Sequence, residues 1–169
     1  AKRTMMIAQQ LYEGIVLGRH GATGLITYMR TDSTRISNLA IEEARSYIVE
    51  EYGKEYIPAH PNVYATGKKA QDAHEAIRPT SISRTPAEVG PYLNRDQLRL
   101  YTLIWQRFTA SQMSPAVYDT IAAQIAAGDY QLRAHGSKLK FKGYISVYIG
   151  AEISKKEKDT LLPELSADD

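Results

Sequence analysis

The chain has 169 residues, of which 43% are hydrophobic and 24% are charged, with a formal net charge of +2 at pH 7. These values are typical of a globular protein and exclude a polybasic arm, although a local patch could still bind nucleic acid. The sequence has no cysteine, which excludes disulfides and thiolate metal sites, and no run approaches the roughly 18 apolar residues of a membrane span.

The first third of the chain is predicted to form two helices separated by a loop and a short apolar segment. Helical spacing of apolar residues predicts a helix over 3–13, and four glycines in 14–24 predict a flexible loop. The run "LITYM" at 25–29 predicts a buried strand or extended segment. Ser37 or Asn38 is a suitable N-cap for a second helix that ends near Gly53. The apolar stripe of the first helix consists of Met5, Ala8, Leu11 and Tyr12.

Further helices are predicted in the middle of the chain. Residues 54–67 have the composition of a loop, and a short helix is expected over 69–77, before Pro79. "TPAE" at 85–88 matches a capping box with proline at the first helical position. A longer helix is predicted from about Arg95 to about residue 114, because large apolar residues recur there at three- and four-residue steps.

The hydrophobic period changes from helical to alternating after residue 116. "VYDTIAAQI", "YQLRAH" and "SKLKFKGYISVYIG" alternate, and "AAGD" can form a turn between strands. We therefore predict an α+β chain, with a mainly helical domain over 1–115 and a β-rich segment with a polar tail over 116–169. We expect the chain to be a piece of a longer protein, because its tail is polar and its helical pattern is already under way at residue 1.

The segment around Tyr28 carries a dense set of polar side chains. Most tyrosines are packing residues with a hydrogen-bonded tip, and this chain has 12. A tyrosine nucleophile, however, has a reference pKa of about 10 and needs cations or a base nearby. Arg30 and Arg35 could supply the cations, and in an extended segment Arg30 lies on the side of Tyr28, with Asp32 placed to orient an arginine.

A second polar cluster, "QDAHEAIRPT", occupies residues 71–80. On a helix His74 and Arg78 would lie four residues apart and could hold one phosphate. A surface helix with a Glu75 pair and a capping histidine is the alternative explanation, which this segment alone favours. One histidine among scattered carboxylates does not predict a zinc site.

Basic and aromatic residues share the same part of the chain and could form a groove that follows a phosphate backbone and stacks bases. A solvated charged face explains this composition equally well. The residues are Arg30, Arg35, Lys68, Lys69, Arg78 and Arg84, with Tyr47, Tyr52, Tyr56 and Tyr64.

Together, "GLITYMRTDSTRIS" and "QDAHEAIRPT" resemble the two signature segments of bacterial type IA DNA topoisomerases, in the form found in topoisomerase I. "AKRTMMIAQQLYEG" and "LIWQRFTASQMSPAVYD" also resemble that family, so the resemblance covers most of residues 1–150. It implies that 1–115 corresponds to the family's domain III, which carries the active-site tyrosine, and that 116–169 belongs to domain II.

The resemblance implies that Tyr28 attacks a single-strand DNA phosphodiester and becomes joined to the 5′ phosphate. After strand passage the free 3′ hydroxyl reseals the break, so that negative supercoils are relaxed without ATP. Arg30 then supports the scissile phosphate, and His74 and Glu13 complete the catalytic set. DNA contacts are expected from Gln9, Thr27, Thr31, Asp32, Ser33, Arg35 and Arg78.

The resemblance also implies partners outside this chain. Members of the family bind Mg²⁺ through an acidic Toprim domain, for which we find no matching cluster here, so we expect no metal ligand in this piece and no relaxation by the piece alone. The expected partners are single-stranded or negatively supercoiled DNA, the Toprim domain and the other domain II segment of the same polypeptide. No membrane partner is expected, and the protein would be a cytoplasmic, nucleoid-associated monomer.

Three other functions fit parts of the sequence. A non-catalytic DNA-binding module would bury Tyr28 as a structural residue. A tyrosine recombinase would place a His-x-x-Arg pair ahead of its tyrosine, whereas here Tyr28 precedes a His-x-x-x-Arg pair. A plain helical interaction domain would show no salt-sensitive DNA binding.

Overall fold

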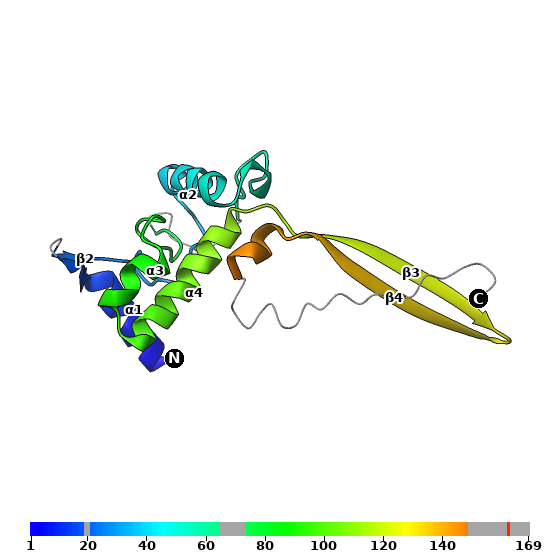
Figure 1. The fold of residues 1–169 in the computed structure, drawn as a ribbon. Helices are drawn as coiled ribbons and strands as arrows, with labels where there is room; N and C mark the ends of the chain where they lie inside the picture. Colours follow the sequence, from blue (N-terminus) through cyan, green and yellow to red (C-terminus); the bar gives the residue numbers. More distant parts are fainter. Residues whose placement is uncertain (19–20, 65–73, 149–161, 163–169) are drawn as a thin grey trace. The chain divides into compact units, whose positions relative to one another are not determined.

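A computed structural model describes residues 1–18, 21–64, 74–148 and 162, and combines helices with antiparallel strands (Figure 1). The predicted α+β class is therefore confirmed. The chain divides into two compact units, Ala1–Ser114 and Pro115–Asp169. The candidate site lies in the first unit, which contains the described α-helices.

The helices of the first unit are α1 (Lys2–Glu13), α2 (Asn38–Glu51), α3 (Pro86–Val89) and α4 (Arg95–Ser111). The starts of α2, α3 and α4 follow from side-chain caps that satisfy free N–H groups of the first turn. The Ser37 hydroxyl accepts from the Ala40 N–H at the start of α2. Thr85 and Glu88 form the predicted capping box of α3, and Asn94 with Gln97 forms another at α4. The capped helix starts predicted at Ser37 and Thr85 are thus confirmed.

Helix α4 is the centre of the core of this unit. It buries Tyr101, Trp105 and Phe108, and α1 packs against it. Burial of the two polar aromatics requires partners for their tips. The Tyr101 hydroxyl donates to the Arg84 carbonyl at 2.6 Å, and the Trp105 indole N–H donates to the Ile82 carbonyl at 2.8 Å. These bonds fix the loop before α3 onto the helix.

Helix α1 buries a narrower stripe than the sequence predicted. Ala8 and Leu11 are buried, but Met5 and Tyr12 are exposed. The predicted 14–24 loop also contains a small hairpin of β1 (Ile15–Val16) and β2 (Ala22–Thr23). The exposed apolar side chains of α1 leave that face of the helix open to a cleft.

Two segments distant in sequence pair beside α1. The Thr80 N–H donates to the Leu25 carbonyl, Ile26 forms an isolated antiparallel bridge with Pro79, and the Thr27 N–H donates to the Arg78 carbonyl. The 25–29 run is therefore extended and buried at its start, as expected, but does not form a regular strand. The helix predicted over 69–77 is wrong at residues 74–77, which are not helical; residues 69–73 lie outside the described part.

The second unit contains an antiparallel hairpin of β3 (Val117–Ala127) and β4 (Tyr130–Phe141), joined by a turn at Gly128. Both strands and the turn were predicted. Continuation of the second strand to residue 150 was wrong, because Gly143 adopts a left-handed φ of 49° and residues 143–148 form a 3₁₀-helix. Across the residues that the structure describes, no helix is long and apolar enough to cross a membrane.

Gly24 is the position where the extended segment comes closest to α1. A β carbon at this residue would lie 2.7 Å from the Tyr12 carbonyl oxygen, and the neighbouring Leu25 N–H donates to the Leu11 carbonyl at 2.7 Å. Both contacts are with backbone atoms, which cannot rotate away. A side chain here must therefore displace the segment that leads to Tyr28.

We expect Gly24→Ala to lower the free energy of unfolding by about 2 kcal/mol, because it overpacks a backbone contact. Urea unfolding followed by the fluorescence of Trp105, the single tryptophan, measures this change in the helical unit. Leu39→Ala on α2 is the control, since Leu39 is 68% exposed and its truncation should change the free energy of unfolding by less than about 0.5 kcal/mol. Equal stability of the two variants would contradict the prediction.

Candidate active site

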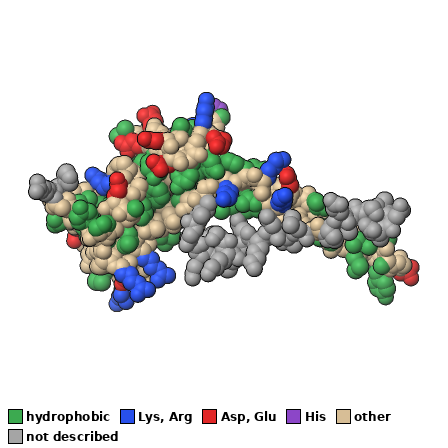
Figure 2. Space-filling model, in the orientation of Figure 1, with side chains coloured by type: hydrophobic (Ala, Val, Ile, Leu, Met, Phe, Trp, Pro, Cys, Tyr) green, Lys and Arg blue, Asp and Glu red, His purple; other side chains and the backbone are tan. Residues whose placement is uncertain are grey.

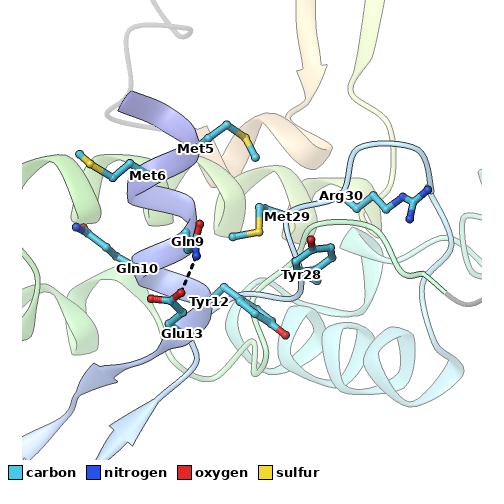
Figure 3. A pocket seen from close by; sticks show the side chains of 9 residues that line it. All are labelled: Met5, Met6, Gln9, Gln10, Tyr12, Glu13, Tyr28, Met29 and Arg30. Carbon is cyan, nitrogen blue, oxygen red and sulfur yellow. Dashed lines mark hydrogen bonds between the residues drawn. The ribbon is translucent and has the colours of Figure 1, made fainter. Parts of the chain in front are cut away.

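An open cleft of about 820 Å³ lies between α1 and the segment that carries Tyr28 (Figure 3). One wall is the exposed face of α1 and the other is the segment 28–30. The cleft combines flexible apolar side chains with a carboxylate, amides, a guanidinium and two phenols. The lining residues are Met5, Met6, Gln9, Gln10, Tyr12, Glu13, Tyr28, Met29 and Arg30.

Tyr28 is exposed at this cleft instead of packed into the core. The residue is 52% exposed, whereas its sequence neighbours Leu25, Ile26 and Met29 are buried. The Tyr12 ring meets it edge to face with centroids 5.3 Å apart, and the His74 ring lies 6.3 Å from it. A buried backbone thus presents an accessible phenol that is flanked by two rings.

Gln9 and Glu13 reach the cleft from α1. They are four residues apart, so they share one face of the helix, and the Gln9 amide donates to the Glu13 carboxylate at 2.7 Å. Figure 3 shows both side chains on the face of α1 that lines the cleft, near Tyr12. This arrangement places one oriented carboxylate in the cleft that contains Tyr28.

Arg30 is paired with Asp32, as the two-residue spacing predicted. Its Nε donates to the Asp32 carboxylate at 2.7 Å, and the two side chains are 42% and 32% exposed. Figure 3 shows the Arg30 guanidinium extending away from the Tyr28 hydroxyl. An ion pair this exposed contributes at most about 1 kcal/mol, so Arg30 can exchange Asp32 for another anion at little cost.

The backbone around His74 is held by the segment that carries Tyr28. The Ser33 hydroxyl donates to the His74 carbonyl at 2.7 Å, and the Ala76 N–H donates to the Arg35 carbonyl at 2.7 Å. The Thr27 hydroxyl donates to the Ala76 carbonyl at 2.7 Å and accepts from the Arg78 N–H at 3.0 Å. The two sequence clusters therefore form one hydrogen-bonded unit.

Ser33 and Arg78 have partners within the fold, and the DNA contacts predicted for them stay predictions. Ser33 is 7% exposed, and its oxygen also accepts from the Arg35 N–H at 3.2 Å. The Arg78 guanidinium bonds Glu75 at 2.7–2.8 Å and the Pro79 carbonyl at 3.0 Å, with only 13% of its side chain exposed. Their hydrogen-bonding groups are used within the fold.

Thr31 and Arg35 are exposed but face other cavities. Thr31 borders an apolar cavity of about 310 Å³ behind Met29, whose wall includes Ile77 and Leu103. Arg35 borders a smaller cavity of about 230 Å³ together with Tyr64. The structure thus brings Gln9, Glu13, Arg30 and His74 near Tyr28, while these two residues lie at its margins.

The tyrosines considered for a base-stacking groove have contacts within the fold. Tyr47 packs edge-on against Trp105, and burial raises the pKa of its phenol to about 12. Tyr52 packs against Tyr56, and the Tyr64 hydroxyl donates to the Ser111 carbonyl. Figure 2 shows acidic side chains gathered over α2, a surface that would repel phosphate; Lys68 and Lys69 lie outside the described residues.

Tyr12 and Met29 are site residues that the sequence did not single out. Tyr12 was assigned to the apolar stripe of α1, yet its ring lies in the cleft against Tyr28. The available signal was its position three residues after Gln9 and next to Glu13, which places it on the polar edge of the helix. In the described part of the chain, no three histidine or carboxylate side chains converge as metal ligands.

Comparisons with known proteins agree with the resemblance in the sequence. A family model described as DNA topoisomerase matches residues 1–169. The chain is also similar to the solved structure of full-length topoisomerase I from Thermotoga maritima, with 44% identity and a TM-score of 0.79 over 98% of this chain. The match covers 25% of the Thermotoga protein, so the chain spans about a quarter of that relative's length.

The Glu75–Arg78 pair gives a test of the hydrogen-bonded unit. We expect Glu75→Ala to lower the free energy of unfolding by about 2 kcal/mol, because it leaves a largely buried guanidinium without its carboxylate. Arg3→Ala, which deletes the exposed Arg3–Asp96 pair, should change it by less than about 1 kcal/mol. Both are measured by urea unfolding of the helical unit; equal losses would show that the Glu75 pair is no stronger than a surface pair.

Proposed function

The chain belongs to the bacterial type IA DNA topoisomerase family, and we propose on that premise that Tyr28 is the nucleophile that cleaves one DNA strand. The observation that carries this proposal is an exposed phenol, with the imidazole of His74 beside it, at a cleft that also contains Glu13 and Arg30. A tyrosine held by packing alone would not need this exposure.

The proposed reaction is a reversible transfer of a phosphoryl group. The Tyr28 oxygen loses its proton and forms a bond to the phosphorus, while the bond from phosphorus to the 3′ oxygen breaks and that oxygen takes up a proton. The products are a 5′-phosphotyrosine and a free 3′ hydroxyl. Because the ester keeps the energy of the broken bond, the reverse attack reseals the strand without ATP.

Arg30 is proposed to support the negative charge of the scissile phosphate. Its guanidinium is bound to Asp32. A phosphate in the cleft would compete with that carboxylate for a guanidinium that forms charge-assisted hydrogen bonds with either anion. Since the existing pair is exposed and weak, turning Arg30 toward the phosphate costs little compared with the stabilisation gained.

His74, Glu13 and Gln9 are proposed to complete the site. The imidazole beside Tyr28 can donate a hydrogen bond to a phosphate oxygen, and the Glu13 carboxylate, bonded by Gln9, lies in the same cleft. Thr27 acts through the backbone, because its hydroxyl joins the Tyr28 segment to residues 76–78. Thr31, Asp32 and Arg35 are exposed at the margins and remain proposed DNA contacts.

The activity of the whole protein requires more than this chain. We propose that residues 1–115 form the tyrosine-bearing domain III, and that 116–169 supply part of domain II. The Mg²⁺ of the reaction would be held by a Toprim domain elsewhere in the polypeptide, and relaxation of negative supercoils would need that domain. The quarter-length match to the Thermotoga enzyme supports this division. We further propose that the complete protein acts as a cytoplasmic monomer on DNA of the nucleoid.

A non-catalytic DNA-binding module is the second function that we considered. It would bury Tyr28 as a structural residue, but Tyr28 is 52% exposed and lines the cleft. The exposure of Tyr28 therefore favours the catalytic role.

Covalent capture tests the role of Tyr28. The full-length protein with Mg²⁺ and a single-stranded oligonucleotide labelled at its 3′ end should yield labelled protein on a denaturing gel. We expect Tyr28→Phe to abolish this product and leave DNA binding nearly unchanged, because only the attacking oxygen is lost. Tyr12→Phe is the matched control from the same cleft and should still be captured. Label on the Tyr28→Phe protein would refute the assignment.

The rate of the same reaction tests the role of Arg30. We expect Arg30→Ala to slow single-turnover cleavage by about 10² to 10³, the scale for loss of one group that stabilises developing charge. Arg95→Ala, which removes an exposed arginine at the start of α4 away from this cleft, is the control and should stay near the parental rate. An unchanged rate for Arg30→Ala would remove Arg30 from the mechanism.

A further inference from the structure

Ser33 lies at the junction of the two segments that build the site. Its hydroxyl donates to the His74 carbonyl at 2.7 Å and accepts from the Arg35 N–H at 3.2 Å. At 7% exposure, it is one of the few polar side chains in the buried set of the described residues. A buried hydroxyl that uses both its donor and an acceptor position is positioned by the fold and in turn positions its partners.

The bond from Ser33 acts on the histidine itself. The neighbouring links are made to Ala76, whose N–H donates to the Arg35 carbonyl and whose carbonyl accepts from Thr27. The Ser33 hydroxyl instead binds the carbonyl of His74, the residue whose ring lies 6.3 Å from the Tyr28 ring. The His74 Nδ1 is also buried and has no hydrogen-bond partner among the described residues, so no bond at Nδ1 orients the ring.

We propose that Ser33 is a positioning residue that holds His74 beside Tyr28, and that it does not contact DNA. This inference rests on the proposed function, because it assigns Ser33 an effect on the cleavage step. Ser33 fixes the peptide from which the imidazole projects, and the packing against Tyr28 sets the remaining freedom of the ring. A displacement of about 1 Å at a reacting group is enough to slow a reaction 100-fold, so a single backbone bond can matter for the rate.

A double-mutant cycle in the full-length protein tests the proposal. Single-turnover cleavage of the 3′-labelled oligonucleotide is measured for Ser33→Ala, His74→Ala and the double variant. We expect losses of about 10-fold for Ser33→Ala and about 100-fold for His74→Ala. The double variant should stay within threefold of His74→Ala, because Ser33 has nothing to position once the imidazole is gone.

Several outcomes would overturn the proposal. A double variant slowed by the product of the two losses, about 1000-fold, would mean that Ser33 acts independently of His74. If Ser33→Ala acted only by lowering the folded fraction, it would slow the His74→Ala protein by the same factor as the parent. The cycle therefore separates positioning of His74 from general destabilisation. A His74→Ala rate equal to the parental rate, or a DNA Kd more than fivefold weaker in Ser33→Ala, would likewise refute it.

Control variants keep the test decisive. Ser111→Ala deletes another partly buried hydroxyl, which donates to the Phe108 carbonyl at 2.6 Å. This variant should leave the cleavage rate unchanged. If Ser33→Ala does not fold, Ser33→Thr keeps the hydroxyl; a rate within threefold of the parent supports the proposal, and a 100-fold loss with unchanged Tm contradicts it. Tyr28→Phe in the same assay separates the two levels: covalent capture by that variant refutes the proposed function itself, whatever the cycle shows.

Discussion

The hydrogen-bonded pairing of residues 24–35 with residues 74–80 is the constraint on which the site depends. Leu25 and Thr27 make the ladder contacts with Thr80 and Arg78, and the hydroxyls of Thr27 and Ser33 extend the pairing toward His74. Each such bond contributes about 1 kcal/mol when made, and leaving a buried partner unpaired costs more. Tyr28 and His74 therefore share one hydrogen-bonded support, although 45 residues separate them in the chain.

Helix α1 reaches the same support through its backbone. The Leu11 carbonyl accepts from Leu25, and Gly24 passes so close to Tyr12 that no side chain fits. This contact sets the distance between the carboxylate of Glu13 and the segment that carries Tyr28. The cleft is therefore formed by three chain segments whose backbones are bonded to one another, while its flexible methionines and exposed rings can adapt to a ligand.

Local sequence patterns predicted the capped helices, whereas the pairing of distant segments could not be predicted from the sequence. The caps at Ser37 and Thr85 and the apolar steps along α4 are short-range signals, and the structure confirms them. The pairing of Ile26 with Pro79 joins segments that are separated by helix α2 and leaves no period in the sequence, so residues 74–77 were assigned to a helix. The internal partners of Ser33 and Arg78 could not be predicted either, because residue type does not say whether a hydroxyl or guanidinium binds a phosphate or a group of the protein itself. Tyr28 could be singled out as a candidate because it stands in a dense and specific motif, and its role as the nucleophile stays a prediction.

The proposed cleavage and resealing of a strand accounts for a fixed backbone around Tyr28 beside an Arg30 side chain with an exposed partner. For resealing, the phosphotyrosine must stay where the 3′ hydroxyl can return to it, which favours a support of buried bonds such as those from Thr27 and Ser33. The guanidinium must instead bind a phosphate that is absent before DNA arrives, which favours an exposed and replaceable partner such as Asp32. If Arg30 were held in a largely buried pair like Glu75–Arg78, its release would cost more for each strand bound, since an ion pair is more expensive to break the less it is exposed to water. The difference in burial between the two arginine pairs therefore matches the different demands that cleavage and resealing make on them.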